Sequence, residues 1–352
     1  MDSPQSQPVT PGSPYKDGSQ PAGSTDLSGA EALELKKQVI QGNLRGLREY
    51  LARTREACDW QDRLFMLNLI VPSLSRGTLD AACEAEPGAV DLLLIRCAFF
   101  CELASTMRGT KTSNHVTEES FYNAGECIQG ALSLLEPISQ LDAQDPTPFA
   151  YVLPCLRIFG QLKATQQRVF QQATELAPDL APAYRTIVNS LSERWGGSHE
   201  ESLQFARFAM TKGSPGGDMA LCLFWAHLLV QSHFATFDKS PAAARRYVRN
   251  PEVIKELEAA FDSWIKPPYH PRRSSIPYLH YAACWFYLSR DHERLGRALS
   301  LINNVFYELP WSYQGNARKM YILAVQFAAG KAPTPNSEAN WLTRLMRSLT
   351  AG

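Results

Sequence analysis

Apolar residues recur every three or four positions from Ala30 onward, which is the spacing of one helix face. One apolar stripe lies in residues 35–40 and a second in residues 44–51, on either side of Gly42 and Asn43. No segment alternates apolar and polar residues over the length of a strand. The pattern therefore predicts an all-α protein, and its first two helices should form a tight hairpin.

The ends of further helices can also be predicted from single residues. Asp59 is a suitable N-cap for the third helix, and Pro72 is expected to kink that helix or end it early. Apolar stripes continue through residues 90–104 and 121–135. Gly and Pro residues fall between the stripes, for example at Pro146, Pro178 and the pair Gly196 and Gly197. We expect helix and turn to alternate along the whole chain.

Two prolines recur at a fixed distance. Pro148 and Pro182 lie 34 residues apart, and each is expected to open a helix shortly after an earlier proline. Between them, Phe170, Ala173 and Pro178 place an aromatic, a small residue and a proline at successive steps of three and five. Small residues allow two antiparallel helices to approach closely, and a proline stops the second helix.

These positions resemble those of the tetratricopeptide-repeat superfamily, whose units are 34 residues long. A later stretch has a similar ending, with Ala298, Ile302 and Pro310 at the small, large and proline positions. The block Trp195–Ala206 is similar to a segment of uncharacterised bacterial helical-repeat proteins. The resemblance implies a right-handed array of antiparallel helix hairpins, a tetratricopeptide-like α-solenoid that binds a protein or peptide in its concave groove. It implies no catalytic residue.

Composition divides the chain into four parts. Residues 1–27 are rich in Pro, Ser, Gly and Gln with almost nothing apolar, so we expect a disordered tail. We then predict divergent N-terminal hairpins in residues 28–145 and tetratricopeptide-like repeats in 146–235. Residues 236–352 should hold C-terminal hairpins with a basic loop, closed by a capping helix near residues 337–349.

The overall charge argues against two classes of partner. The 35 Lys and Arg residues balance 35 Asp and Glu residues, so no net field favours nucleic acid or an anionic membrane. The longest apolar stretch, Met219–Val230, is far shorter than the roughly 20 residues needed to cross a bilayer. The eight cysteines form no C-x-x-C pair and follow no secretory leader, which indicates reduced thiols in the cytoplasm.

Sequence motifs of enzymes and metal sites are missing as well. There is no G-x-S-x-G, no phosphate-binding loop and no H-E-x-x-H, so we predict no catalytic residue, no cofactor and no metal. Cys97 and Cys101 continue an apolar stripe, which favours a core position over a zinc ligand. A carboxylate or His site assembled across helices would leave no linear trace, so an enzyme remains the alternative, together with a structural subunit of a larger assembly.

Two segments are candidates for binding a partner. Residues 195–201 form an unusual turn, in which Ser198 and Glu201 make a capping box that could equally serve only to start a helix. Residues 239–275 hold eight Lys and Arg residues against four Asp and Glu residues. Such a patch is either a solvated face or a site for an acidic or phosphorylated partner.

Aromatic residues crowd the last third of the chain. Most lie at helical spacing and should be core, but Tyr281, Trp285 and Tyr287 cannot all face one way, so some should line the groove. Tyr, Trp and Arg are the residues that most often dominate binding interfaces. We therefore predict a protein or peptide partner, acidic in character, that contacts Tyr184, Trp195, His199, Arg245, Arg246, Arg249, Arg272, Arg273, Tyr281 and Trp285.

Overall fold

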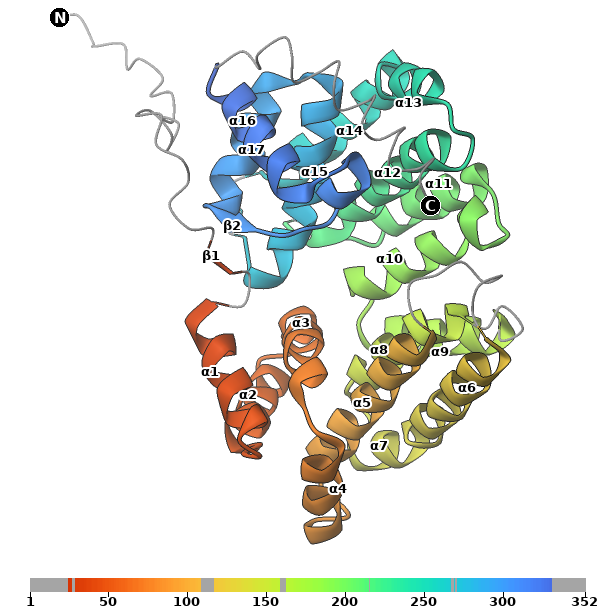
Figure 1. Cartoon of the computed structure of the whole chain (residues 1–352), viewed down its shortest axis with the longest axis vertical. Coiled ribbons are helices and arrows are strands. Elements are labelled where there is room, and N and C mark those ends of the chain that lie inside the picture. Colours follow the sequence, from red (N-terminus) through yellow and green to blue (C-terminus); the bar gives the residue numbers. More distant parts are fainter. Residues whose placement is uncertain are drawn as a thin grey trace, which may run out of the picture. The chain divides into compact units, whose positions relative to one another are not determined.

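The computed structural model describes residues 25–26, 29–108, 117–158, 163–214, 216–266, 269 and 271–330. Nearly all of these residues lie in helices and the turns between them (Figure 1), which confirms the all-α prediction. Within the described part of the chain, the strands are limited to β1 (Thr25–Asp26) and β2 (Val305–Phe306), which pair in parallel. Apart from β1, the predicted disordered tail lies outside the described residues, as does the predicted capping helix.

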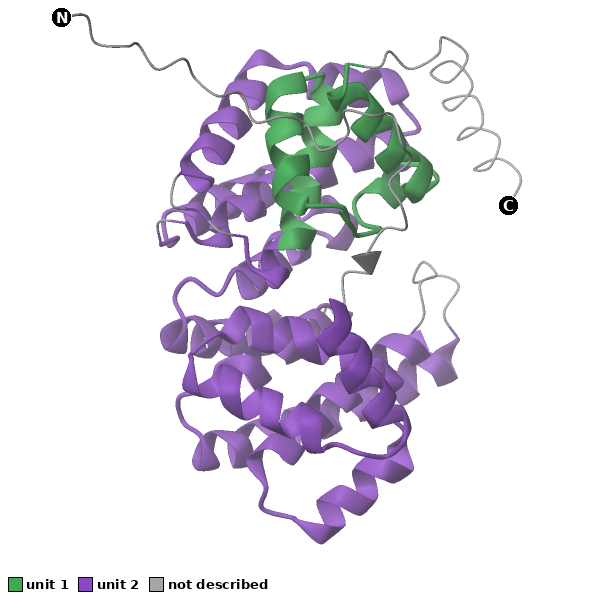
Figure 2. Ribbon diagram, turned by 90° about the vertical axis from the view of Figure 1, so that its left-hand side faces the viewer, with its two compact units in different colours: residues 1–27, 276–352 green, residues 28–275 purple. Residues whose placement is uncertain are grey.

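The chain forms two compact units (Figure 2). The larger unit is Ser28–Ser275, and the smaller combines Met1–Leu27 with Ile276–Gly352. The helices of the larger unit are α1 (Gly29–Ile40), α2 (Arg45–Glu56), α3 (Trp60–Ile70), α4 (Arg76–Ala85), α5 (Val90–Arg108), α6 (Glu118–Ser133), α7 (Leu135–Leu141), α8 (Thr147–Ile158), α9 (Lys163–Leu176), α10 (Ala181–Ser190), α11 (His199–Met210), α12 (Leu221–Thr236), α13 (Pro241–Val248) and α14 (Pro251–Trp264). Those of the smaller unit are α15 (Ile276–Ser289), α16 (His292–Ile302) and α17 (Ala317–Ala328).

The first helices end where local chemistry predicts. Gly42 adopts a φ of 83°, a left-handed conformation that favours glycine, in the turn between α1 and α2. The Asp59 side chain accepts a hydrogen bond from the Asp62 N–H and caps α3. Helix α3 ends at Ile70, and Pro72 lies in the short 3-10 helix Val71–Ser73 that follows. The predictions of a hairpin, a cap and an early helix end are therefore confirmed.

The core of the larger unit is made by neighbouring antiparallel helices. Helix α5 packs against α6 and α8, and α8 packs against α9. Cys97 and Cys101 on α5 are 0% and 2% exposed, which confirms their core position. Pro154 lies inside α8 without ending it. The many packed helix pairs are compatible with a helical-repeat fold.

Helix α12 is the most apolar of the larger unit. Within the described residues, one helical stretch, Asp218–Thr236, is long and apolar enough to cross a membrane. However, 67% of its most apolar window is buried inside the protein, as in the core helix of a soluble protein. Helix α12 packs against α10, α11 and α13, and these neighbours position the candidate site.

The smaller unit is organised around a buried histidine. His280 on α15 is 0% exposed and accepts a hydrogen bond from the Trp311 indole N–H at its Nδ1, over 2.8 Å. Its Nε2–H donates to the Val305 carbonyl oxygen over 2.9 Å. Burial lowers the pKa of His280 to about 4, so the imidazole is neutral at pH 7.

Candidate functional site

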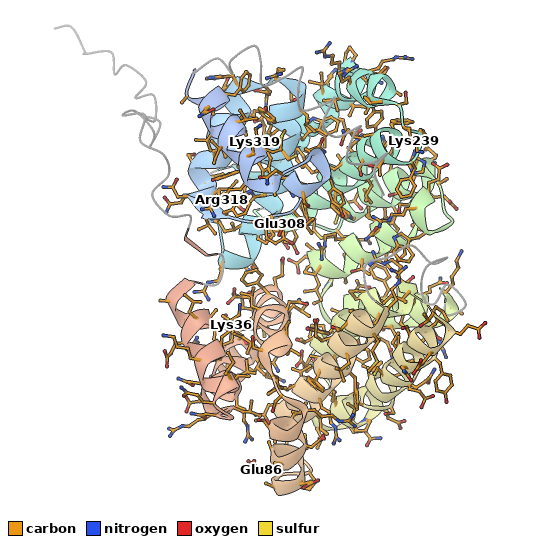
Figure 3. All side chains as sticks on the ribbon, viewed as in Figure 1. Lys36, Glu86, Lys239, Glu308, Arg318 and Lys319 are labelled. Atoms are coloured by element: carbon orange, nitrogen blue, oxygen red, sulfur yellow. The ribbon has the colours of Figure 1, made fainter. Side chains whose placement is uncertain are left out.

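A short basic helix, α13, connects α12 to α14. Lys239, labelled in Figure 3, lies in the turn after α12, and the Ser240 hydroxyl caps α13 by accepting a hydrogen bond from the Ala243 N–H. At the other end, Asn250 Oδ1 accepts from the Glu252 N–H over 3.0 Å and caps α14. Pro241 and Pro251 each stand at the first position of their helix. Both helix starts are thus set by local sequence.

A groove of about 850 Å³ runs along α13. It is lined by Phe234, Ala242, Ala243, Arg245, Arg246, Tyr247, Arg249, Asn250 and Pro251. The side chains of Arg245, Arg246 and Arg249 are exposed. Among the residues that the structure describes, no carboxylate forms an ion pair with any of the three. We call this surface the arginine groove.

Tyr247 lines the arginine groove, and a buried hydrogen-bond network sets its position. The Tyr247 hydroxyl lies 2.7 Å from His227 Nδ1, and His227 Nε2 lies 3.1 Å from a carboxylate oxygen of Glu256. Arg207 also binds Glu256 with two hydrogen bonds of 2.7 and 3.1 Å. Hydrogen bonds from His227 and Arg207 lower the pKa of Glu256 to about 2, so it is ionised and can only accept.

The ionised Glu256 carboxylate determines which atoms of this network carry protons. Because Glu256 cannot donate, His227 Nε2 must carry the proton that joins them. Burial lowers the pKa of His227, so the ring is neutral and its Nδ1 accepts from the Tyr247 hydroxyl. Burial also raises the pKa of Tyr247, which keeps the hydroxyl protonated. The network therefore orients Tyr247 and does not activate it as a nucleophile.

The turn between α10 and α11 depends on two glycines. Gly196 has a φ of 83°, and a Cβ on Gly197 would clash with the Leu191 carbonyl oxygen. Ser198 Oγ accepts a hydrogen bond from the Glu201 N–H over 3.1 Å, which confirms the predicted capping role. Trp195 lies beneath the guanidinium of Arg157, 4.5 Å from ring centroid to carbon.

A cluster of ionisable side chains forms where this turn meets the end of α12. Its members are Glu193, His199, His233 and Asp238. His199 Nε2 lies 3.0 Å from Glu193 Oε2, and His233 Nε2 lies 3.8 Å from the same oxygen. Asp238 Oδ1 is 3.5 Å from His233 Nε2. Burial lowers the pKa of His199, against the opposing effect of Glu193. We call these four residues the His–carboxylate cluster.

A second cavity, of about 590 Å³, lies beside the loop before α15. Its lining includes Trp264, Lys266, Tyr269 and Arg272. Nearby Asp218 is 3% exposed and accepts a hydrogen bond from the Ser275 hydroxyl over 2.7 Å. Burial raises the pKa of Asp218 to about 6, although Ser275 and the charge of Arg272 lower it.

Polar groups beside this second cavity lie close to one another. Asp218 Oδ1, Trp264 Nε1 and the Tyr269 hydroxyl are all buried. Hydrogen bonding from Trp264 and Tyr269 also lowers the pKa of Asp218, so these donors face its carboxylate. The cavity is therefore bordered by both donors and an acceptor.

The predicted partner-binding residues separate into four groups. Arg245, Arg246 and Arg249 share the arginine groove, and Trp195 and His199 share the turn before α11. Arg272 and Arg273 form ion pairs with Asp59 and Glu31 over 3.3 and 3.5 Å, so they are tied into the fold.

The remaining three predicted residues are buried. Tyr184 is 3% exposed and packs edge-on against Phe170, with ring centroids 5.0 Å apart. Tyr281 and Trp285 on α15 are 0% and 1% exposed. In this structure none of them offers a surface to a partner, because all three side chains are buried in the core. The helical spacing of the aromatic residues indicated that most of them are core. That spacing did not show that these three are also core.

Several groups of the site were missed by the sequence reasoning. Tyr247 and Phe234 carry no motif, and only the structure shows that they line the groove. Glu256 does not line it, but holds His227, the partner of Tyr247. The sequence also offers no reason to join His199 with Glu193, His233 and Asp238. Some of these residues are distant along the chain, and none has the spacing of a metal-ligand motif. Packing of α11 against α12 brings them together.

No protein-family model, no curated protein and no solved structure matches this chain.

Proposed function

We propose that this protein is a non-catalytic, cytoplasmic binding protein, a scaffold or adaptor that holds an acidic protein segment in the arginine groove. We further propose that its helix pairs form a tetratricopeptide-like right-handed array, in which α8, α10 and α12 line a shared concave surface. The finding that carries the proposal is the set of three exposed arginines in one groove, none of them paired with a described carboxylate.

The charge of the arginine groove is available to a ligand. Arg245 and Arg246 lie in the last turn of α13 and Arg249 directly follows it, so three guanidinium groups are presented within one and a half turns. A guanidinium binds a carboxylate through two parallel hydrogen bonds, which gives both affinity and orientation. Other exposed arginines, such as Arg45 and Arg53, are already paired with Glu49 and Glu31.

The groove also offers an apolar contact of fixed geometry. The rings of Phe234 and Tyr247 pack edge-on with centroids 5.7 Å apart, and both line the groove. His227 and Glu256 hold Tyr247 in place, so little side-chain entropy is lost when a ligand packs against it. An acidic segment that also carries an aromatic or aliphatic residue fits both features.

The proposal is tested with a short fluorescein-labelled peptide rich in Asp and Glu that contains one Phe. Fluorescence anisotropy should show saturable binding that weakens as salt is added. The triple variant Arg245→Gln, Arg246→Gln and Arg249→Gln should bind about tenfold to hundredfold more weakly, since exposed charge pairs contribute about 0.5–1 kcal/mol each.

A matched control separates the groove from overall charge. The variant Arg45→Gln, Arg76→Gln and Arg168→Gln removes three exposed arginines from α2, α4 and α9 and changes the net charge equally. It should bind the peptide as the wild type does. Equal loss of affinity in both triple variants would show general charge attraction and contradict the proposed groove.

The second cavity favours a different function, which is binding or conversion of a small molecule. A volume of about 590 Å³ is within the range of ligand pockets, and Asp218 has a pKa near 6, suitable for a general acid or base near neutral pH. A metabolite that copurifies with the wild type and is lost from Tyr269→Phe, which deletes one hydroxyl, would support this alternative.

A further inference from the structure

The His–carboxylate cluster lies where two segments of the larger unit meet. Glu193 begins the 3-10 helix Glu193–Trp195, and His199 is the first residue of α11. His233 lies in the last turn of α12, and Asp238 follows that helix. Since α11 and α12 pack as antiparallel neighbours, the start of one lies beside the end of the other (Figure 1).

The distances in the cluster match those between ligands of one metal ion. One ligand atom from each of Glu193, His199 and His233 lies within 4.8 Å of the other two. The separations of 3.0 and 3.8 Å to Glu193, and of 3.5 Å from His233 to Asp238, are close to ideal. Two ligands of tetrahedral zinc, each about 2.0–2.1 Å from the metal, lie about 3.4 Å apart.

The imidazole rings are held in this orientation by aromatic packing. His199 packs edge-on against His233 and Phe234, with centroid distances of 4.9 and 5.6 Å. The His233 ring stacks on Phe237 at 5.1 Å, with an angle of 19° between the planes. Both Nε2 atoms are therefore held within 3.8 Å of one carboxylate oxygen before any metal binds, which reduces the cost of forming a site.

The alternative is a set of ordinary hydrogen bonds between the same groups. A histidine that only needs an acceptor is satisfied by one carboxylate, yet here both Nε2 atoms approach Glu193 Oε2, and His233 also approaches Asp238. Two imidazoles and two carboxylates facing one another form the nitrogen and oxygen set that Zn²⁺ prefers. Ca²⁺ and Mg²⁺ require mostly oxygen ligands.

The cluster is also reachable from solvent. The side chains of His199 and His233 are 25% and 15% exposed, and those of Glu193 and Asp238 are 50% and 47% exposed. Metal can therefore enter without unfolding, and the carboxylates need only side-chain rotation to close around it. Their two negative charges balance the charge of a divalent cation.

We propose that Glu193, His199 and His233 bind one Zn²⁺ ion, which clips the turn before α11 to the end of α12. Asp238 lies 3.5 Å from His233 and supplies the fourth ligand once its exposed side chain rotates toward the ion, which gives the filled tetrahedral shell of a structural site. Phe234 follows His233 directly and lines the arginine groove, so the ion also stiffens one wall of that groove. The zinc site does not depend on the proposed peptide-binding function.

The test uses the full-length protein after treatment with a chelator. Isothermal titration with Zn²⁺ should give one tight site per chain, and Co²⁺ should give the visible absorption of a tetrahedral site with nitrogen and oxygen ligands. His199→Gln and His233→Gln should each weaken Zn²⁺ binding by more than about tenfold. Glu193→Gln, at a half-exposed position, should also weaken Zn²⁺ binding while the circular dichroism spectrum remains that of the wild type.

His292→Gln is the matched control, since it removes one exposed imidazole from α16 of the smaller unit, which contributes no residue to the cluster. It should leave both the stoichiometry and the affinity unchanged. The proposal is overturned if no stoichiometric site is found, or if Zn²⁺ binds all the cluster variants as tightly as it binds His292→Gln.

Discussion

Arg63 on α3 and Asp145, two residues before α8, form a buried ion pair of 3.0 Å across 82 residues of sequence. Their side chains are only 5% and 2% exposed. Arg63 also donates to the Leu51 carbonyl oxygen, and Asp145 Oδ1 accepts from the Thr147 N–H over 2.8 Å. The pair therefore joins the N-terminal hairpins to the start of α8.

Asp145→Asn keeps the shape of the side chain and its hydrogen bond to Thr147 but removes the charge. Because Arg63 would be left as an uncompensated buried charge, we expect a loss of about 3–5 kcal/mol in the free energy of unfolding. Chemical denaturation measures this. Asp142→Asn, which breaks the more exposed pair with Arg55, should cost about 1 kcal/mol or less, and equal losses would contradict the argument.

Ser198→Ala removes the cap of α11. The variant loses the hydrogen bond to the Glu201 N–H, so stability should fall by about 1 kcal/mol. Thermal unfolding measures this change. Binding of the acidic peptide should be unaffected, because Ser198 does not line the arginine groove. Weaker peptide binding at temperatures where the variant is folded would show that the turn itself contacts the partner.

His280 should make stability depend on pH. Its folded pKa of about 4 lies below the unfolded value of about 6.5, so the native state binds fewer protons between them. The part of the unfolding free energy that depends on His280 is therefore highest above pH 6.5. It should fall by about 3 kcal/mol in total as the pH falls toward 4. The difference in unfolding free energy between the wild type and His280→Gln should follow this curve. A difference that does not vary with pH would mean that the imidazole is not buried in neutral form.

Asp218 should change the stability of the protein with pH in the opposite direction. Its folded pKa of about 6 lies above the unfolded value of about 3.8, so the native state binds more protons and loses stability as pH rises through this range. Asp218→Asn removes the charge and keeps an acceptor for Ser275. Relative to the wild type, this variant should gain about 3 kcal/mol in unfolding free energy between pH 4 and pH 7. The opposing effects of His280 and Asp218 partly cancel in the wild type, so each is measured against its own variant.

Much of the fold was predictable because helix signals are local. The cap at Asp59, the helix end near Pro72 and the capping box at Ser198 depend on residues within one turn of each other, and all three are confirmed. The candidate site was predictable only in part. A run of arginines is visible in the sequence, but their ion pairs are not. Arg272 is paired with Asp59, whereas Arg249 forms no ion pair with a described carboxylate.

The sequence by itself determined that the described chain is helical and where many of its helices begin and end, because periodicity, caps and prolines act over a few residues. Tertiary structure alone decided which polar groups meet. His199 approaches Glu193 and His233 because α11 packs against α12. Tyr247 is held in the lining of a groove because His227 on another helix accepts a hydrogen bond from its hydroxyl. Such contacts depend on how helices pack in three dimensions, and the spacing of residues along the chain does not encode them directly.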